Sequence, residues 1–169
     1  MTALVQSLAS YREFHRDHRN VFTHALGIPM IVLSVEVLLS RPVWDVSGMV
    51  LTPAIVANIL AALWYLRLDL KFGALMSVLL AVFAIAGHHI AQVSDLTWLG
   101  GGVGLFVIGW LFQFVGHHYE GRKPAFVDDI RSLLVGPLFM VAEGLFALGL
   151  CQELRRKVEQ GPAQAPLRS

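Results

Sequence analysis

The chain has 169 residues, enough for one domain, and 56% of them are hydrophobic while only 15% are charged. Its mean hydropathy of +0.62 lies outside the range of an ordinary soluble domain, so we expect lipid to surround most of it. The net charge of +1, without a basic stripe carrying interleaved aromatic residues, argues against nucleic-acid binding. The single cysteine, Cys151, excludes an internal disulfide and a cysteine-based metal cage.

Apolar runs predict an all-α, polytopic transmembrane bundle. Residues 1–20 are polar and mixed in charge, which indicates an interfacial N-terminal helix rather than a signal peptide. Four later runs each approach the ~20 residues that a helix needs to cross a hydrocarbon core of ~30 Å. These four predicted spans are residues 22–40, 46–66, 72–91 and 96–115.

A fifth apolar run, residues 133–150, is a weaker candidate for a span. Gly136-Pro137 interrupts it, and Glu143 lies near its middle. Proline disfavours a helix interior, so we expect a re-entrant or interfacial segment here. The chain is then a single membrane-embedded helical domain over residues 1–155, followed by a flexible C-terminal tail over residues 156–169.

The basic residues predict the orientation of the bundle. Four spans place 12 of the 13 lysines and arginines on one side of the membrane, and only Arg41 on the other. Cytoplasmic loops carry such an excess of positive charge, so both termini are expected in the cytoplasm. A fifth full span would export Arg155, Arg156 and Lys157, which disfavours it.

Five of the seven histidines fall on that same side of the membrane: His15, His18, His24, His117 and His118. Histidine at membrane depth is costly and typically marks a functional site. His24 follows Asn20 into an apolar run where an unpaired imidazole is poorly solvated. His117 follows Gly116, which leaves room for another backbone or a ligand. We therefore expect these side chains to converge, either at a metal or in a structural hydrogen-bonding role.

The remaining histidines are weaker candidates. His18 and His118 fit polar residues of the membrane interface. The segment Phe83-x-x-x-Gly87-His88-His89 repeats the pattern that ends in His117-His118, but His88 lies 17 residues beyond Lys71. A helical rise of ~1.5 Å per residue puts it roughly 25 Å away, at the opposite face of the membrane. We therefore leave His88 and His89 out of the predicted site.

Glu120 follows His117 by three residues and lies on nearly the same face if the helix continues. It can serve as a second ligand or as a hydrogen-bonding partner of a ligand. Neutral imidazoles with a carboxylate and open positions suit a non-haem Fe(II) that reacts with oxygen. Zinc accepts the same ligands, so ligand type alone leaves the metal open.

Two motifs resemble those of the membrane 2-hydroxy-fatty-acid dioxygenases, the family of the fungal endoplasmic-reticulum enzyme of phytosphingosine breakdown and its bacterial relatives. The first is Tyr11-x-x-x-His15-x-x-x-x-Asn20-x-x-x-His24-x-x-x-x-Pro29. The second is Gln113-Phe114-x-Gly116-His117-x-x-Glu120-Gly121-x-Lys123-Pro124-Ala125, followed by Leu133-Leu134-x-Gly136-Pro137. The resemblance covers both ends of the chain and the hydropathy between them.

The resemblance implies an Fe(II)-dependent α-oxidation, in which a 2-hydroxy fatty acid reacts with O₂ and loses one carbon. It assigns His15, His24 and His117 to the metal, with Asn20 and Glu120 as catalytic polar residues beside them. The substrate's 2-hydroxyl and carboxylate would chelate the iron, and its acyl chain would lie among apolar helices. From the apolar spans and the distribution of basic residues we expect an integral membrane protein, in a bacterial inner membrane or, in a eukaryote, in the endoplasmic reticulum.

Three other functions compete with this interpretation. A di-iron desaturase or hydroxylase uses about eight histidines in HxxxH and HxxHH boxes, and neither pattern occurs here. A b-type cytochrome would bind haem between His24 and His117. A non-catalytic lipid-binding protein would need no metal. Arg122 and Lys123 could attract a substrate carboxylate, or could simply be cytoplasmic positive charges.

Overall fold

The computed structural model describes residues 2–161, and the part it describes is mostly helical. Along the chain the α-helices are α1 (Ala3–Arg12), α2 (His18–Leu39), α3 (Pro53–Leu68), α4 (Leu70–Val93), α5 (Gly102–Glu120), α6 (Ser132–Ala147) and α7 (Gln152–Glu159). A π-helical turn, Leu96–Gly101, precedes α5, and a 3₁₀ turn, Ala125–Val127, precedes α6. Two short strands, β1 (Trp44–Val46) and β2 (Met49–Leu51), form an antiparallel hairpin between α2 and α3.

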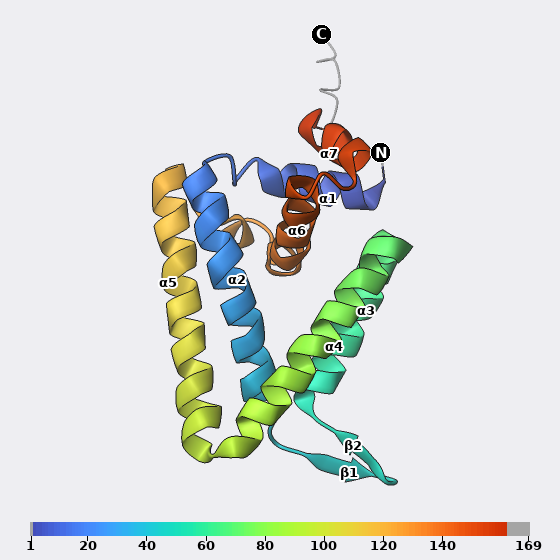
Figure 1. Cartoon of the computed structure of the whole chain (residues 1–169), viewed down its shortest axis with the longest axis vertical. Helices are drawn as coiled ribbons and strands as arrows, with labels where there is room; N and C mark the ends of the chain where they lie inside the picture. Colours follow the sequence, from blue (N-terminus) through green and yellow to red (C-terminus); the bar gives the residue numbers. More distant parts are fainter. Residues whose placement is uncertain (1, 162–169) are drawn as a thin grey trace.

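Helices α2, α3, α4 and α5 run up and down the molecule, with α2 antiparallel to α5 and α3 antiparallel to α4 (Figure 1). Helix α2 packs along α5, and α3 packs along α4. The two pairs meet where α2 contacts α4. The hairpin lies at one end of these helices, while α1, α6 and α7 lie at the other (Figure 1).

Glycines allow α2 and α5 to approach closely. A Cβ atom added to Gly27 on α2 would lie 2.7 Å from the backbone oxygen of Gly109 on α5. A Cβ added to Gly109 would lie 2.9 Å from the backbone oxygen of Gly27. Small residues at a helix interface permit such contact between backbones, which is a common way for helices to associate in lipid.

A hydrophobic core joins α1, α6 and α7 to the nearby ends of α3 and α4. Leu8 of α1 and Leu138 and Phe139 of α6 are almost fully buried within it. At the edge of this core, Arg12 of α1 pairs with Glu143 of α6 and with Glu159 of α7. These contacts fix α1 across the end of the bundle, and so fix the start of the turn that leads into α2.

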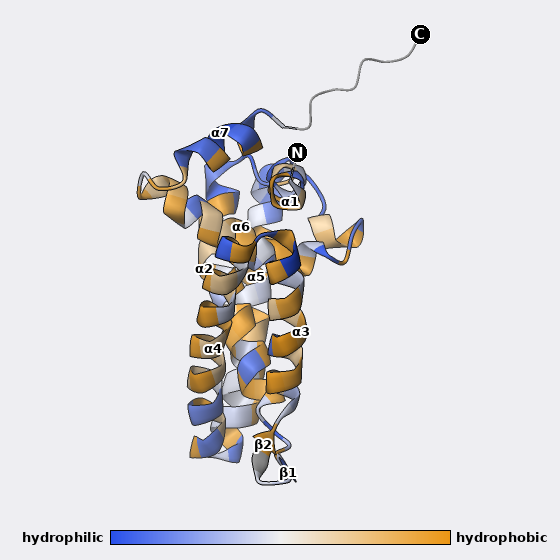
Figure 2. Ribbon diagram, turned by 90° about the vertical axis from the view of Figure 1, so that its right-hand side faces the viewer, coloured by the Kyte–Doolittle hydropathy of each residue, from blue (hydrophilic) through white to orange (hydrophobic). Residues whose placement is uncertain are grey.

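Within the described part of the chain, three helices are long and apolar enough to cross a membrane: His18–Leu39, Leu70–Val93 and Leu96–Glu120, the last including the π-helical turn. Helices α3 and α6 are apolar but shorter, with 16 residues each. Large hydrophobic side chains on the outer faces are exposed, as for Leu60, Val78 and Leu111. Figure 2 shows hydrophobic residues along α3 and α4 and hydrophilic residues in α7. This pattern is typical of a lipid-facing bundle with a polar end.

The second predicted span begins later than its hydropathy indicated. Residues 46–51 belong to the hairpin, and α3 begins only at Pro53. Ser47 and Gly48 have φ values of 56° and 83°, the positive values that two-residue hairpin turns require. The side chain of Thr52 then caps the first turn of α3, and a proline at the first helical position favours the same start.

The predicted interruption of the fifth run at Gly136-Pro137 was wrong. Helix α6 continues through Pro137, and α7 follows as a separate short helix. Pro137 lies in the second turn of α6, where its missing N–H removes a single backbone hydrogen bond. Burial of Leu138 and Phe139 stabilises the helix directly after it.

Helix α7 also covers the first four residues of the predicted C-terminal tail, because it ends at Glu159. Residues 162–169 of that tail lie outside the described residues. At the other end, the predicted interfacial segment consists of α1, a turn, and the first residues of α2.

Candidate metal centre

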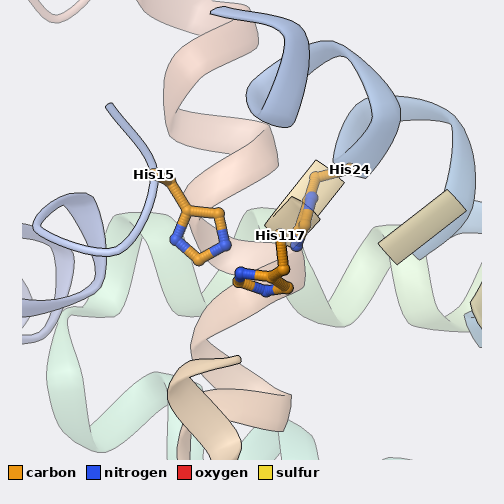
Figure 3. Close-up of side chains that lie close together, drawn as sticks. All are labelled: His15, His24 and His117. Atoms are coloured by element: carbon orange, nitrogen blue, oxygen red, sulfur yellow. The ribbon is translucent and has the colours of Figure 1, made fainter. Parts of the chain in front are cut away.

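Three buried histidines from three different elements converge at the end of the α2–α5 pair (Figure 3). His15 lies in the turn between α1 and α2, His24 on α2, and His117 near the end of α5. Their ring centroids lie 4.5 Å apart for His15–His24, 4.9 Å for His24–His117 and 5.2 Å for His15–His117. One ligand atom from each histidine lies within 4.8 Å of the others.

Backbone carbonyls orient two of these rings in the same way. Nδ1 of His15 lies 2.9 Å from the carbonyl oxygen of Tyr11, and Nδ1 of His24 lies 3.0 Å from that of Asn20. A carbonyl only accepts, so each Nδ1 carries the proton and donates it. Each Nε2 therefore keeps a free lone pair, which is the usual tautomer of a metal-binding histidine.

His15 is held as a neutral imidazole. It is 2% exposed, and its ring stacks on that of Tyr11 with the centroids 4.1 Å apart. Burial is the largest cause that lowers the pKa of His15, to about 4. At neutral pH its Nε2 is thus available to bind a metal without first losing a proton.

Unpartnered nitrogens in the cluster fit a metal ion. Nε2 of His15 and Nδ1 of His117 are buried and have no hydrogen-bond partner among residues 2–161. Buried polar atoms nearly always have a hydrogen-bond partner, so two unpartnered nitrogens in one cluster indicate that a ligand binds there. Three neutral imidazoles suit a divalent transition metal and leave further coordination positions open.

Glu120 and Asn20 hold the turn that carries His15. The carboxylate of Glu120 accepts hydrogen bonds from the backbone N–H groups of Arg16 (3.0 Å) and Asp17 (2.9 Å). It also accepts one from Nδ2 of Asn20 at 3.0 Å. Two roles were expected for Glu120, a metal ligand or a hydrogen-bonding partner of a ligand. This geometry favours the second role, in which Glu120 positions His15.

Asn20 is completely buried and makes contacts on both sides of the cluster. Its side chain donates to Glu120 and to the carbonyl of Phe14 at 3.1 Å. Its backbone carbonyl accepts a hydrogen bond from the Nδ1–H of His24. Gly116 makes room for these contacts, because a Cβ there would lie 2.5 Å from Oδ1 of Asn20.

The other histidines lie apart from the cluster. His18 and His118 are exposed at the same end of the molecule. His88 and His89 line a separate pocket near the hairpin, together with Ser40 and Thr52. This position at the far end of α4 agrees with the one predicted from the helical rise.

The two basic residues beyond Glu120 are engaged with other parts of the chain. Arg122 donates to the backbone carbonyl of Glu13, and Lys123 pairs with Asp128. These contacts fit a structural role near the surface better than the attraction of a carboxylate into the cluster.

A mainly apolar pocket opens beside the histidines, between α2, α5 and α6, and His24 and His117 form part of its wall. Trp110 and Gln113 of α5 also line it. Sequence reasoning quoted Gln113 in a motif but gave it no role, and it missed Trp110. Their spacing was the available signal, because residues three and four positions apart, such as 110, 113 and 117, share a helix face.

The arrangement of the rings bears on the haem alternative. The planes of His24 and His117 meet at 87°, with their centroids 4.9 Å apart, and His15 lies close to both. Three imidazoles whose ligand atoms lie within 4.8 Å of one another form a candidate site for a single ion. Two axial histidines of a haem would instead face each other across the porphyrin.

The family model described as "2-hydroxy-palmitic acid dioxygenase Mpo1-like" matches residues 1–148 of this chain. The chain belongs to the Mpo1-like family. It is also 36% identical over 160 residues to the 2-hydroxy-palmitic acid dioxygenase MPO1 of Saccharomyces cerevisiae, covering 92% of this chain and 87% of the yeast protein. No solved structure matches the chain. The match to the Mpo1-like family includes α1 to α6, and with them the whole histidine cluster.

Proposed function

We propose that this protein is an Fe(II)-dependent dioxygenase that shortens 2-hydroxy fatty acids by one carbon. The observation that carries this proposal is the convergence of His15, His24 and His117, with unpartnered buried nitrogens, in a chain of the Mpo1-like family. The name of the yeast relative supplies the substrate class and the reaction type.

In this proposal the three histidines hold the iron. Fe(II) held by these residues would supply the electrons that activate O₂, and three imidazoles would leave positions open for a chelating substrate. The overall reaction balances as RCH(OH)COOH + O₂ → RCOOH + CO₂ + H₂O. The C1–C2 bond breaks, the two carbons together lose four electrons, and O₂ accepts all four, so no other reductant is needed.

The protein's own groups position the ligands. The carbonyls of Tyr11 and Asn20 fix the proton on each Nδ1 and so direct each Nε2 inward. Asn20 and Glu120 then act as positioning residues, because they tie the His15 turn to α2 and α5. The apolar pocket beside His24 and His117 receives the first carbons of the acyl chain.

We also propose how the protein lies in the membrane. Helices α2, α3, α4 and α5 form four spans, with α3 crossing alongside α4, while α1, α6 and α7 stay at one interface. Both termini are then cytoplasmic, and the histidine cluster lies close to the cytoplasmic surface. The basic residues near α1, α7 and the α3–α4 turn support this orientation. The membrane is a bacterial inner membrane, or the endoplasmic reticulum in a eukaryote.

A turnover assay on the purified protein tests the function. With Fe(II) and O₂, the protein should convert a long-chain 2-hydroxy acid into the acid one carbon shorter. It should leave the unhydroxylated acid largely untouched, because that acid lacks one arm of the chelate, and a 3-hydroxy acid should react poorly. Equal turnover of all three acids, or full activity after iron removal and zinc loading, would contradict the proposal.

A further inference from the structure

Two hydrogen-bond donors on α5 are buried without an acceptor near the histidine cluster. They are the indole Nε1–H of Trp110 and the amide Nε2–H of Gln113, and neither has a partner among residues 2–161. Gln113 as a whole is only 6% exposed. An unsatisfied buried donor costs free energy, so a pair of them in one place indicates a ligand that accepts hydrogen bonds.

Both donors belong to residues that line the pocket shared with His24 and His117. Gln113 precedes His117 by one turn of α5, and Trp110 precedes Gln113 by three residues, so the three lie along one face of the helix. Phe126 packs edge-on against the Trp110 ring, with the centroids 5.1 Å apart, and helps to fix its orientation.

The rest of the pocket limits what the ligand can be. Its wall is mostly apolar, as at Ile28, Ile31 and Leu133, and among residues 2–161 no lysine or arginine lines it. A hydrophobic chain therefore fits along it, while an anionic head group must be held by neutral donors and by a metal at the histidines. Such an occupant is an amphipathic acid with its polar end toward α5.

We propose that Gln113 and Trp110 bind the substrate's carboxylate and set its orientation at the metal. This inference rests on the proposed function. A substrate chelated through its 2-hydroxyl and one carboxylate oxygen would keep its second carboxylate oxygen free to accept from Gln113 and Trp110. The two residues then select acids over other 2-hydroxylated lipids, and their hydrogen bonds direct the acyl chain away from α5, along Ile28 and Leu133.

Binding measured without turnover tests this assignment on the full-length protein in detergent. Loaded with Fe(II) and kept free of oxygen, the protein is titrated with 2-hydroxypalmitate and with 1,2-hexadecanediol, which keeps the hydroxyl and chain but lacks the carboxylate. Gln113→Leu should raise the Kd for the acid roughly tenfold, as expected for one lost hydrogen bond to a charged group, and leave the Kd for the diol unchanged. Trp110→Phe keeps an aromatic ring but removes the N–H donor. It should likewise raise the Kd for the acid and leave the Kd for the diol unchanged.

A pocket variant without a polar group provides the control. Leu133→Ala should weaken acid and diol alike, because it removes only apolar contact. If Gln113→Leu and Trp110→Phe also weaken both ligands equally, their roles are structural and the inference is wrong. If Gln113→Leu does not fold, Trp110→Phe decides the question alone. A wild-type protein that binds the acid more tightly than the diol, but does not oxidise it in air, would contradict the proposed function and leave this inference standing.

Discussion

Asn20 and His24 lie one turn apart on α2, and the Nδ1–H of His24 donates to the carbonyl of Asn20 over 3.0 Å. The side chain of the same asparagine donates to Glu120 at the end of α5. One fully buried residue thus orients a histidine through its backbone and ties α2 to α5 through its side chain. The cluster is therefore held by a connected hydrogen-bond network rather than by packing alone.

The first prediction concerns the three histidines. His15→Ala, His24→Ala and His117→Ala should each lose bound iron and reduce activity by on the order of 100-fold or more, because each removes one of the three proposed protein ligands. The variants should still insert into the membrane. Iron content of the purified proteins, measured by elemental analysis together with turnover, provides the check.

His88→Ala is the matched control for this series. His88 lies at the hairpin end of α4, so this variant should keep both iron and activity. Loss of iron in the His88 variant with retention in the His24 variant would show that the metal lies elsewhere.

The second prediction concerns Glu120. Glu120→Gln keeps the size of the side chain but removes the charge that strengthens its hydrogen bonds to the N–H groups of Arg16 and Asp17. The His15 turn should loosen, and iron affinity should fall by roughly 10- to 100-fold, as is typical when a partner of a metal ligand is lost. The measurement is a competition titration with an iron chelator. Glu153→Gln, at an exposed site on α7, should have no effect, and equal iron affinity in the two variants would rule out this role for Glu120.

Much of the arrangement could be predicted because membrane topology carries long-range information. In the four-span prediction, the start of the first span and the end of the fourth share a side of the membrane, which puts His24 near His117. The same counting puts His88 at the far end. In a membrane protein, counting the spans thus indicates which helix ends lie close together, whereas the sequence of a soluble protein gives no such indication.

The sequence-based prediction was misleading at two places, the start of the second apolar run and Pro137. The run around Val46 is apolar enough for a span, but positive φ at Ser47 and Gly48 makes it a hairpin. Pro137 was expected to break a helix that the packing of Leu138 and Phe139 stabilises.

The role of Glu120 could not be settled from the sequence, because its partners lie about a hundred residues away in the chain. Local spacing placed Glu120 beside His117 but could not show where its carboxylate points. The donors of Trp110 and Gln113 were hidden for a similar reason, since only the packed helices show that they lack acceptors.

The third prediction concerns topology. Reporter fusions after Gln160 and within residues 122–128 should both read cytoplasmic, and a fusion near Ser94 should read external. In the proposed topology α2, α3, α4 and α5 each cross the membrane once, so the end of α5 lies on the same side as the N-terminus. An external signal after Gln160 would mean that α6 crosses the membrane, and a cytoplasmic signal at Ser94 would mean that α3 does not.

The last prediction concerns Gly116, a point of close contact between α5 and the α2 side of the cluster. A Cβ at this position would lie 2.3 Å from Oγ1 of Thr23 and 2.9 Å from Nδ1 of His24, and both atoms belong to buried side chains. Gly116→Ala must therefore displace these side chains of α2 or push α5 away from α2. It should cost about 1–3 kcal/mol of unfolding free energy by overpacking, and it should weaken iron binding because His117 moves with its neighbour.

Gly104 offers a matched control on the same helix, since a Cβ there would meet nothing within 4 Å. Gly104→Ala should retain full iron affinity and should match or exceed the wild-type melting temperature in detergent, because alanine favours the helix over glycine. Chelator titration and thermal unfolding of both variants compare the same chemical change at a crowded and an open site. If the two variants lose iron equally, close approach of α2 and α5 at Gly116 is not what assembles the histidine cluster.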